Sequence, residues 1–209
     1  MADGLEVKGL EKLTSVRLAE VITQKNSVPA EAITDALYSQ DKHGEPFAQT
    51  LVAAGHITEW DLAKLVAENF QLPFLMASNY QVSDEAKKRI PDKVLFENLI
   101  VPLDLFDDVL CIVMPILTPF ETIMKLQKDS KVEVFPYVGL ISENKKVLGS
   151  LFPEFKAWLD GEQKRREQRA TSRANGKEKE GGDWMSIFDA GDQAIQDTLG
   201  SVKKSAPRR

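Results

Sequence analysis

The chain has 209 residues, of which 43% are hydrophobic and 28% are charged, so it can bury a core in one or two globular domains. Its formal net charge is −5, with an acidic balance in residues 1–160 and a mildly basic one in 161–209, which argues against a nucleic-acid partner. No apolar run reaches the roughly 18 residues of a membrane span, and the acidic N-terminus lacks the apolar segment of a secretory signal, so we expect a cytoplasmic protein.

Residues 8–70 have the apolar spacing of helices throughout. The segment KNSVP ends the first predicted helix, and Pro29 suits the first turn of the second helix. The segment DKHGEP then separates the second helix from the third. We therefore expect a helical subdomain over 8–70.

Strand patterns appear in residues 71–152. The runs LPFLMA and KVEVFPYVG each predict one strand. The run IVPLDLFDDVLCIVMP predicts a hairpin that turns at Asp107–Asp108, and we interpret this acidic pair as a turn and not as a catalytic pair.

Helix signals alternate with these strands. Ser83 is the predicted N-cap of a helix that breaks at Pro91. Thr118 and Pro119 predict the cap and first turn of a second helix, and SENKKVLGSLF predicts a third. The order strand, helix, hairpin, helix, strand, helix predicts a small α+β subdomain with a short sheet over 71–152.

The C-terminal part of the chain changes character twice. A predicted helix from Glu154 to Ala170 loses its apolar stripe after Leu159. The polar run TSRANGKEKEGGD that follows predicts a disordered linker. We therefore expect 153–183 to be a helix that runs into a flexible linker. Residues 184–203 predict an amphipathic docking helix, whose apolar face carries Trp184, Ile187, Phe188, Ile195 and Leu199. Two interpretations remain open: this helix packs on its own domain, or it lies in the groove of a partner.

The sequence has no recognisable catalytic or metal site. Its single cysteine, Cys111, lies in an apolar run and is predicted to be a buried structural thiol. The only histidines, His43 and His56, lie in predicted turns, and we expect His56 to face solvent. The phosphate-binding loop GxxxxGK[ST] is absent, as is any Cys/His cluster for zinc. We therefore expect no enzyme activity, no metal and no required cofactor.

The helical region contains an internal repeat. Residues 17–40 align with 46–69 across the spacer DKHGE, without a gap. Asn26 aligns with Gly55, and both are expected to adopt the left-handed conformation that ends a helix. In the second copy Thr58 is the predicted N-cap of the following helix. The repeat therefore predicts a duplicated helix-turn-helix.

This repeat resembles the N-terminal domain of type II secretion and type IV pilus assembly ATPases, the GspE N-terminal (MshEN) type. The family repeat runs R-L-G, two apolar residues, G, a capped helix and a final Q, twice, and residues 72–138 are similar to the second half of that domain. The resemblance covers about 8–152 and does not include an ATPase domain.

The resemblance implies a cyclic di-GMP site whose motif is only half retained. Ala replaces Gly in both copies, and in the second copy Pro46 stands where the motif has arginine. One lost charge-assisted contact costs about 1.5–3 kcal/mol, or roughly tenfold to a hundredfold in affinity. The motif positions carried over to this chain are Arg17, Leu18, Ala19, Gln40, Phe47, Ala48 and Asn69.

We therefore expect a non-catalytic adaptor that binds a protein partner in a secretion, type IV pilus or motility system, and that reaches the inner membrane only through partners. A cyclic di-GMP receptor with a partly degenerate site is the first alternative. The second alternative is that the sequence is part of a longer ATPase or kinase.

Overall fold

The structure is a computed structural model that describes residues 10–175. The chain divides into two compact units, Met1–Asp160 and Gly161–Arg209. The predicted docking helix 184–203, with Trp184, Ile187, Phe188, Ile195 and Leu199, lies outside the described residues. So does the predicted linker from residue 176 onwards.

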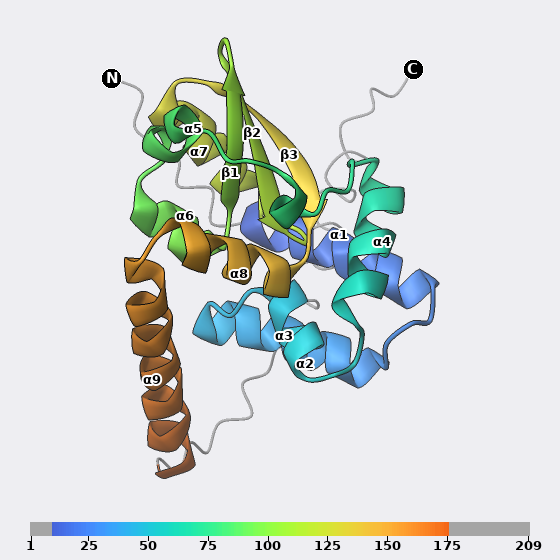
Figure 1. The fold of residues 1–209 in the computed structure, drawn as a ribbon. Coiled ribbons are helices and arrows are strands. Elements are labelled where there is room, and N and C mark those ends of the chain that lie inside the picture. Colours follow the sequence, from blue (N-terminus) through green and yellow to red (C-terminus); the bar gives the residue numbers. More distant parts are fainter. Residues whose placement is uncertain (1–9, 176–209) are drawn as a thin grey trace, which may run out of the picture. The chain divides into compact units, whose positions relative to one another are not determined.

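Four helices form the N-terminal part of the first unit, as expected. They are α1 (Leu10–Gln24), α2 (Ala30–His43), α3 (Phe47–Ala53) and α4 (Glu59–Phe70), drawn in blue to teal in Figure 1. Helix α2 packs against α3, and α1 contacts both α2 and α4. Each helix buries part of its apolar residues, among them Leu18, Ile33, Leu51 and Leu62, whereas Leu13 and Val16 of α1 are exposed.

The two turns of the repeat have the same backbone conformation and the same hydrogen bonds. Asn26 has φ 51° and Gly55 has φ 74°, which confirms the predicted left-handed positions. In each turn an N–H beyond the helix end bonds to a carbonyl of the last turn, at equivalent positions of the two copies: Ser27 to Ile22 at 3.4 Å, and His56 to Leu51 at 3.1 Å. The duplication is therefore present in the backbone as well as in the sequence.

The remainder of the first unit is an α+β layer, which confirms the predicted fold class. Its elements are η1 (Ala77–Asn79), α5 (Asp84–Arg89), α6 (Asp92–Asn98), β1 (Val101–Phe106), β2 (Val109–Pro115), α7 (Phe120–Ser130), β3 (Glu133–Gly139) and α8 (Ile141–Leu151). The strand order is β1-β2-β3, with β1 antiparallel and β3 parallel to β2. The predicted turn at Asp107–Asp108 joins β1 to β2, and Asp107 has φ 51°.

The predicted strand LPFLMA is wrong, because this segment makes only one bridge to the sheet. Phe74 pairs with Val138 of β3. The Val138 N–H donates to the Pro73 carbonyl at 2.8 Å, and the Leu75 N–H donates to the Val138 carbonyl at 2.9 Å. Pro73 has no N–H to extend the ladder, and the chain turns into η1 at Ala77.

Side-chain caps connect the helical part to the α+β layer. Two predicted local caps are present: Ser83 accepts the Ala86 N–H, and Thr58 accepts the Asp61 N–H. The third predicted cap, Thr118, does not cap α7. Instead the Phe120 N–H donates to Oγ1 of Thr14 in α1 at 3.3 Å.

Helix α8 receives its cap from the helical part in the same way. Oε2 of Glu59, the first residue of α4, accepts the Ser142 N–H at 3.0 Å and the Ser142 hydroxyl at 2.8 Å. Leu140, the N-cap residue of α8, has no side-chain oxygen that could cap the helix. Both α7 and α8 are therefore capped by residues distant in the sequence.

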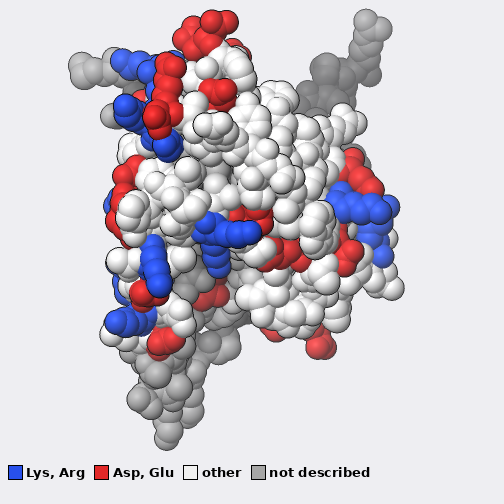
Figure 2. All heavy atoms as spheres, in the orientation of Figure 1, with Lys and Arg blue, Asp and Glu red and all other residues white. Residues whose placement is uncertain are grey.

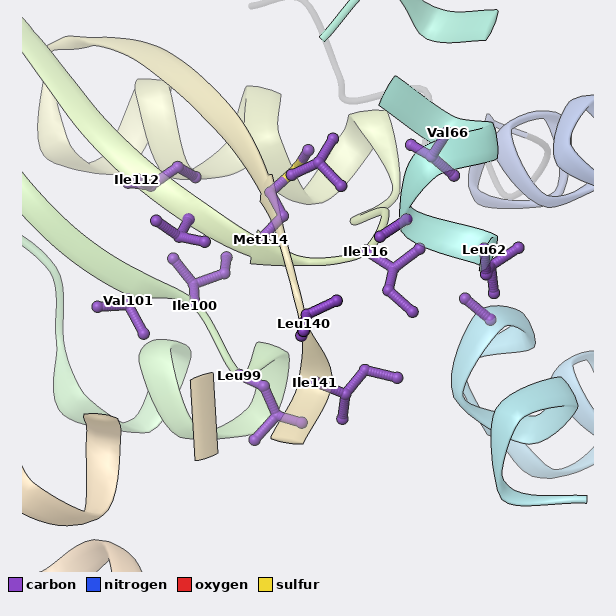
Figure 3. Packing of buried hydrophobic residues seen from close by; sticks show 14 of the residues in the cluster. Leu62, Val66, Leu99, Ile100, Val101, Ile112, Met114, Ile116, Leu140 and Ile141 are labelled. Atoms are coloured by element: carbon purple, nitrogen blue, oxygen red, sulfur yellow. The ribbon is translucent and has the colours of Figure 1, made fainter. Parts of the chain in front are cut away.

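One hydrophobic cluster runs through both parts of the first unit. Figure 3 shows Leu62 and Val66 of α4 on one side of this cluster, and Met114 and Ile116 near its centre. A fully buried amide lies beside it: Nδ2 of Asn144 in α8 donates to the carbonyls of Leu99 and Val113 at 2.9 and 3.0 Å. The helical repeat and the sheet thus share one core.

Helix α9 (Glu154–Asn175) starts in the first unit, where Phe155 and Trp158 pack on Phe96 with ring centroids 5.0 and 5.9 Å away. We expected this helix to end at Ala170, but it continues to Asn175. Residues 162–175 contain no proline or glycine, so no residue breaks the helix there. Among residues 10–175, no helix is both long and apolar enough to cross a membrane.

Candidate functional site

The four apolar residues of the predicted ligand site belong to the protein core. Leu18 and Ala19 of α1 are 1% and 7% exposed, and Phe47 and Ala48 of α3 are 3% and 5% exposed. Their side chains pack in the shared hydrophobic cluster. In this conformation they support the repeat and leave ligand contact to the polar positions.

Arg17 lies on the exposed surface of α1. Its Nη1 donates to Oε2 of Glu20 at 2.9 Å, and the two side chains are 65% and 52% exposed. An exposed pair of this kind is weak, about 0.2–1 kcal/mol, so a stronger anionic ligand could displace Glu20. The guanidinium is accessible, and within residues 10–175 the bond to Glu20 is the one that holds it.

Pro46 occupies the position equivalent to Arg17 and changes the second copy of the repeat. It is the N-cap of α3, with φ −61° and ψ 124°, and it carries neither a charge nor an N–H. Helix α3 therefore begins at Phe47, whereas α1 begins well before Arg17. The second copy lacks both the cation and the helical turn that would carry it.

Gln40 and Asn69 lie near the ends of α2 and α4. The Gln40 carbonyl accepts the Gly44 N–H at 3.0 Å, and its side chain is half-buried. Nδ2 of Asn69 donates to the Leu65 carbonyl of its own helix at 2.8 Å. A hollow of about 530 Å³ lies elsewhere, beside α7 and the start of β3, and none of the seven predicted ligand residues lines it.

Cys111 is half-buried in β2 and not fully buried as expected. Burial raises the pKa of the Cys111 thiol, and the nearby carboxylate of Asp104 raises this pKa further. The thiol is therefore kept neutral, which is unlike an activated nucleophile. His56 is exposed as predicted, and among the described residues no group of three or more His, Cys, Asp or Glu side chains could hold a metal ion.

One surface was not found from the sequence: the partly open face of the sheet. Paired strand residues share a face, so the register places Phe106 beside Val109 and Cys111 beside Phe135. Phe106 is 57% exposed and Phe135 is 46% exposed. The alternation in KVEVFPYVG does predict that Phe135 and Tyr137 share a face, but no local pattern reveals that helices leave this face uncovered.

A duplicated helical hairpin joined to a three-stranded α+β layer is the fold expected of the GspE N-terminal (MshEN-type) domains, and solved structures confirm this likeness. The structure of MshE with cdg matches with a TM-score of 0.51 and 18% identity, covering 64% of this chain and 97% of that chain. The N-terminal domain of XpsE matches with a TM-score of 0.51 and 18% identity, covering 64% of this chain and 92% of that chain. No protein-family model and no curated protein matches the sequence.

Proposed function

We propose that this protein is a non-catalytic adaptor, located in the cytoplasm, that binds protein partners in a secretion, type IV pilus or motility system. The observation that supports this proposal most is the combination of a retained fold and altered polar positions. The first unit has the fold of the MshE and XpsE structures, while Pro46 replaces the second arginine of the motif. A domain that keeps its packing while it loses ligand contacts has a surface role that does not depend on that ligand.

Two regions could serve the partners of such an adaptor. The apolar residues Trp184, Ile187, Phe188, Ile195 and Leu199 remain the predicted docking positions of the terminal segment. The first unit adds its own exposed apolar side chains. An adaptor needs two binding surfaces, and this arrangement offers one in each unit.

A cyclic di-GMP receptor remains the second candidate function. The likeness to a structure of MshE with cdg and the accessibility of Arg17 favour it. A guanidinium can bind phosphate through two parallel hydrogen bonds, and the described partner of Arg17 is the exposed carboxylate of Glu20. Against it, the second copy of the repeat supplies neither an arginine nor a free helix turn at Pro46.

Calorimetry with cyclic di-GMP decides between the two candidates. The full-length chain should give no binding heat at high micromolar nucleotide if it is an adaptor. If heat appears, is lost in Arg17→Ala and persists in Arg89→Ala, the receptor function is correct. Arg89 is the matched control because it is an exposed arginine of α5, outside the repeat.

Affinity capture tests the adaptor function directly. The tagged full-length chain should enrich identified components of a secretion, pilus or motility machine from cells of the source organism, as measured by quantitative mass spectrometry. A chain without residues 183–209 is run in parallel to test the terminal docking segment. Enrichment of no such component by either chain would contradict the adaptor function.

A further inference from the structure

We propose that the open face of the three-stranded sheet binds a cationic amphipathic helix of a partner protein. The inference rests on the proposed adaptor function, because it supplies the partner-binding surface of the first unit. We call this surface the open sheet face and define it by five residues that the register brings together: Phe106, Val109, Cys111, Phe135 and Tyr137.

The open sheet face is apolar and aromatic. In one row across the sheet Phe106 pairs with Val109, in the next Cys111 pairs with Phe135, and in a third Tyr137 pairs with Val113. The Phe135 and Tyr137 rings contact each other edge to face, with centroids 5.2 Å apart. Large exposed aromatic side chains are enriched at the centres of protein interfaces, where they contribute most of the binding energy.

Helix α8 covers only the lower part of this face. Nδ2 of Asn144 donates to the Val113 carbonyl, and a Cβ at Gly139 would clash with Cγ1 of Val113, so α8, β2 and β3 are tightly packed there. Val113 is fully buried, whereas exposure rises toward the hairpin and reaches 57% at Phe106. Figure 1 draws the connection between η1 and α5 across the strands above α8, and Figure 2 shows few charged residues at this level and acidic ones at the hairpin end. The helix layer over the sheet is therefore incomplete at its upper end.

The β3 edge of the sheet is poorly suited to a partner strand. Val138 already uses its outward N–H and carbonyl for the segment 73–75. Pro136, two residues earlier and facing the same edge, has no N–H to donate. Strand addition would therefore gain few backbone bonds, whereas three strands about 4.8 Å apart present a face about as wide as a helix, roughly 10 Å. A helix is the element that would complete this layer.

The strands of the open sheet face are acidic and favour a cationic partner, although Lys128 and Lys131 line a hollow together with Asp108 and Glu133. The strands and their hairpin contain four carboxylates and no Lys or Arg: Asp104, Asp107, Asp108 and Glu133. Asp104 pairs directly with Cys111, and Glu133 pairs directly with Val109, so both lie on this face. Lys and Arg side chains can pair with these carboxylates and stack on the exposed aromatic rings. Anionic lipids and nucleic acids would be repelled.

Binding of two synthetic helical peptides to the full-length chain tests the inference. Both peptides carry the same leucine stripe, one flanked by lysine and arginine and the other by glutamate. Fluorescence anisotropy should show micromolar binding of the basic peptide, and binding at least about tenfold weaker for the acidic peptide. The basic peptide should also slow alkylation of Cys111, the only cysteine, because a docked helix covers it.

Variants assign the binding to this face. Phe106→Ser and Phe135→Ser should each weaken the basic peptide at least tenfold, and Asp104→Asn with Glu133→Gln should weaken it and reduce its salt dependence. Phe120→Ser is the matched control, since Phe120 of α7 is also 57% exposed but lies outside the open sheet face. Circular dichroism melting verifies that each variant folds.

Three outcomes would overturn the inference: equal affinity for both peptides, unchanged binding by both phenylalanine variants, or unchanged alkylation of Cys111. Tighter binding to anionic vesicles than to the basic peptide would also overturn it in favour of a membrane. Its failure is separate from failure of the proposed function. If Phe106→Ser captures the same partners as the unchanged chain, the open sheet face is not the binding surface. The adaptor function is then still supported.

Discussion

Asn26 and Gly55 show how two different residues adopt the same backbone conformation at equivalent positions of the repeat. Both have positive φ at the end of the first helix of a repeat copy. Glycine adopts this conformation without strain, and asparagine is the side-chain residue that tolerates it best. At Gly55 an added Cβ would meet nothing within 4 Å, so conformation and not space determines the residue.

Substitution of Gly55 by alanine therefore measures the conformational cost alone. We expect Gly55→Ala to lower the free energy of unfolding by about 1 kcal/mol, measured by urea denaturation. Gly149→Ala is the control, because Gly149 lies within α8 without positive φ and its Cβ would make an ordinary 3.8 Å contact with Phe155. That change should raise stability by about 0.5–1 kcal/mol. Equal effects at the two glycines would contradict the left-handed assignment.

At the scale of elements, two helices of the α+β layer depend on the helical repeat for their caps. Thr14 of α1 accepts the Phe120 N–H of α7, and Glu59 of α4 accepts two donors of Ser142 in α8. The first four N–H groups of a helix have no partner within the helix, so a distant oxygen satisfies them as well as a local one. These bonds link folding of the two parts.

A double-mutant cycle on Glu59 and Ser142 measures that link. Glu59→Ala should cost about 1–2 kcal/mol, because it leaves the start of α8 without its acceptor, and Ser142→Ala should cost about 0.5–1.5 kcal/mol. The double variant should lose less than the sum, with a coupling of about 0.5–1 kcal/mol by chemical denaturation. Glu68→Ala, an exposed carboxylate on the same helix, should change stability by less than about 0.5 kcal/mol. Strict additivity would show that the contact contributes no stability.

The same elements show which parts of the fold local sequence can predict. Ser83, Thr58 and the left-handed turns follow from rules that operate over three or four residues, and these predictions are confirmed. The predicted cap Thr118 is wrong because Thr14, more than a hundred residues earlier, takes the role. The predicted strand at LPFLMA is wrong because Pro73 and the turn into η1 limit this segment to a single bridge, between Phe74 and Val138.

The burial of the predicted ligand positions could not be read from the sequence, and their role in ligand binding stays a prediction. Helical periodicity marks Leu18 and Phe47 as apolar positions, yet only the packing of four helices shows that they are closed to solvent. The pairing of Arg17 with Glu20 follows from their spacing of three residues on one helix. The open sheet face is exposed because no helix covers it. The local sequence of the strands does not show whether a helix packs over them.

At the scale of the whole molecule, the core of the first unit is complete before the second unit begins. The buried cluster extends from Leu18 to Phe155. Phe155 is 1% exposed and stacks on Trp158 with an interplanar angle of 15°. The start of α9 thus belongs to the folded body, although most of that helix lies beyond it.

Truncation and a core substitution distinguish the contribution of the start of α9 from that of the residues after this helix. A chain that ends after Asn175 should keep the melting temperature of the full-length chain within about 2 °C. We expect the free energy of unfolding to change by less than about 1 kcal/mol, and a change of that size shifts the melting temperature by only a few degrees. Phe155→Ala should lower the melting temperature by roughly 6–20 °C, because truncating a buried phenylalanine costs about 3–5 kcal/mol. Differential scanning calorimetry measures both. A large loss in the truncated chain would mean that residues after 175 complete the core.

Pro136 affects how copies of this molecule behave at high concentration. A strand at the rim of a sheet is a template on which further chains can add, and such growth leads to fibres. The proline interrupts the outward row of donors on β3 at its middle. This edge therefore has no donor at that position, and the molecule resists polymerisation through the β3 edge even when many copies are crowded together.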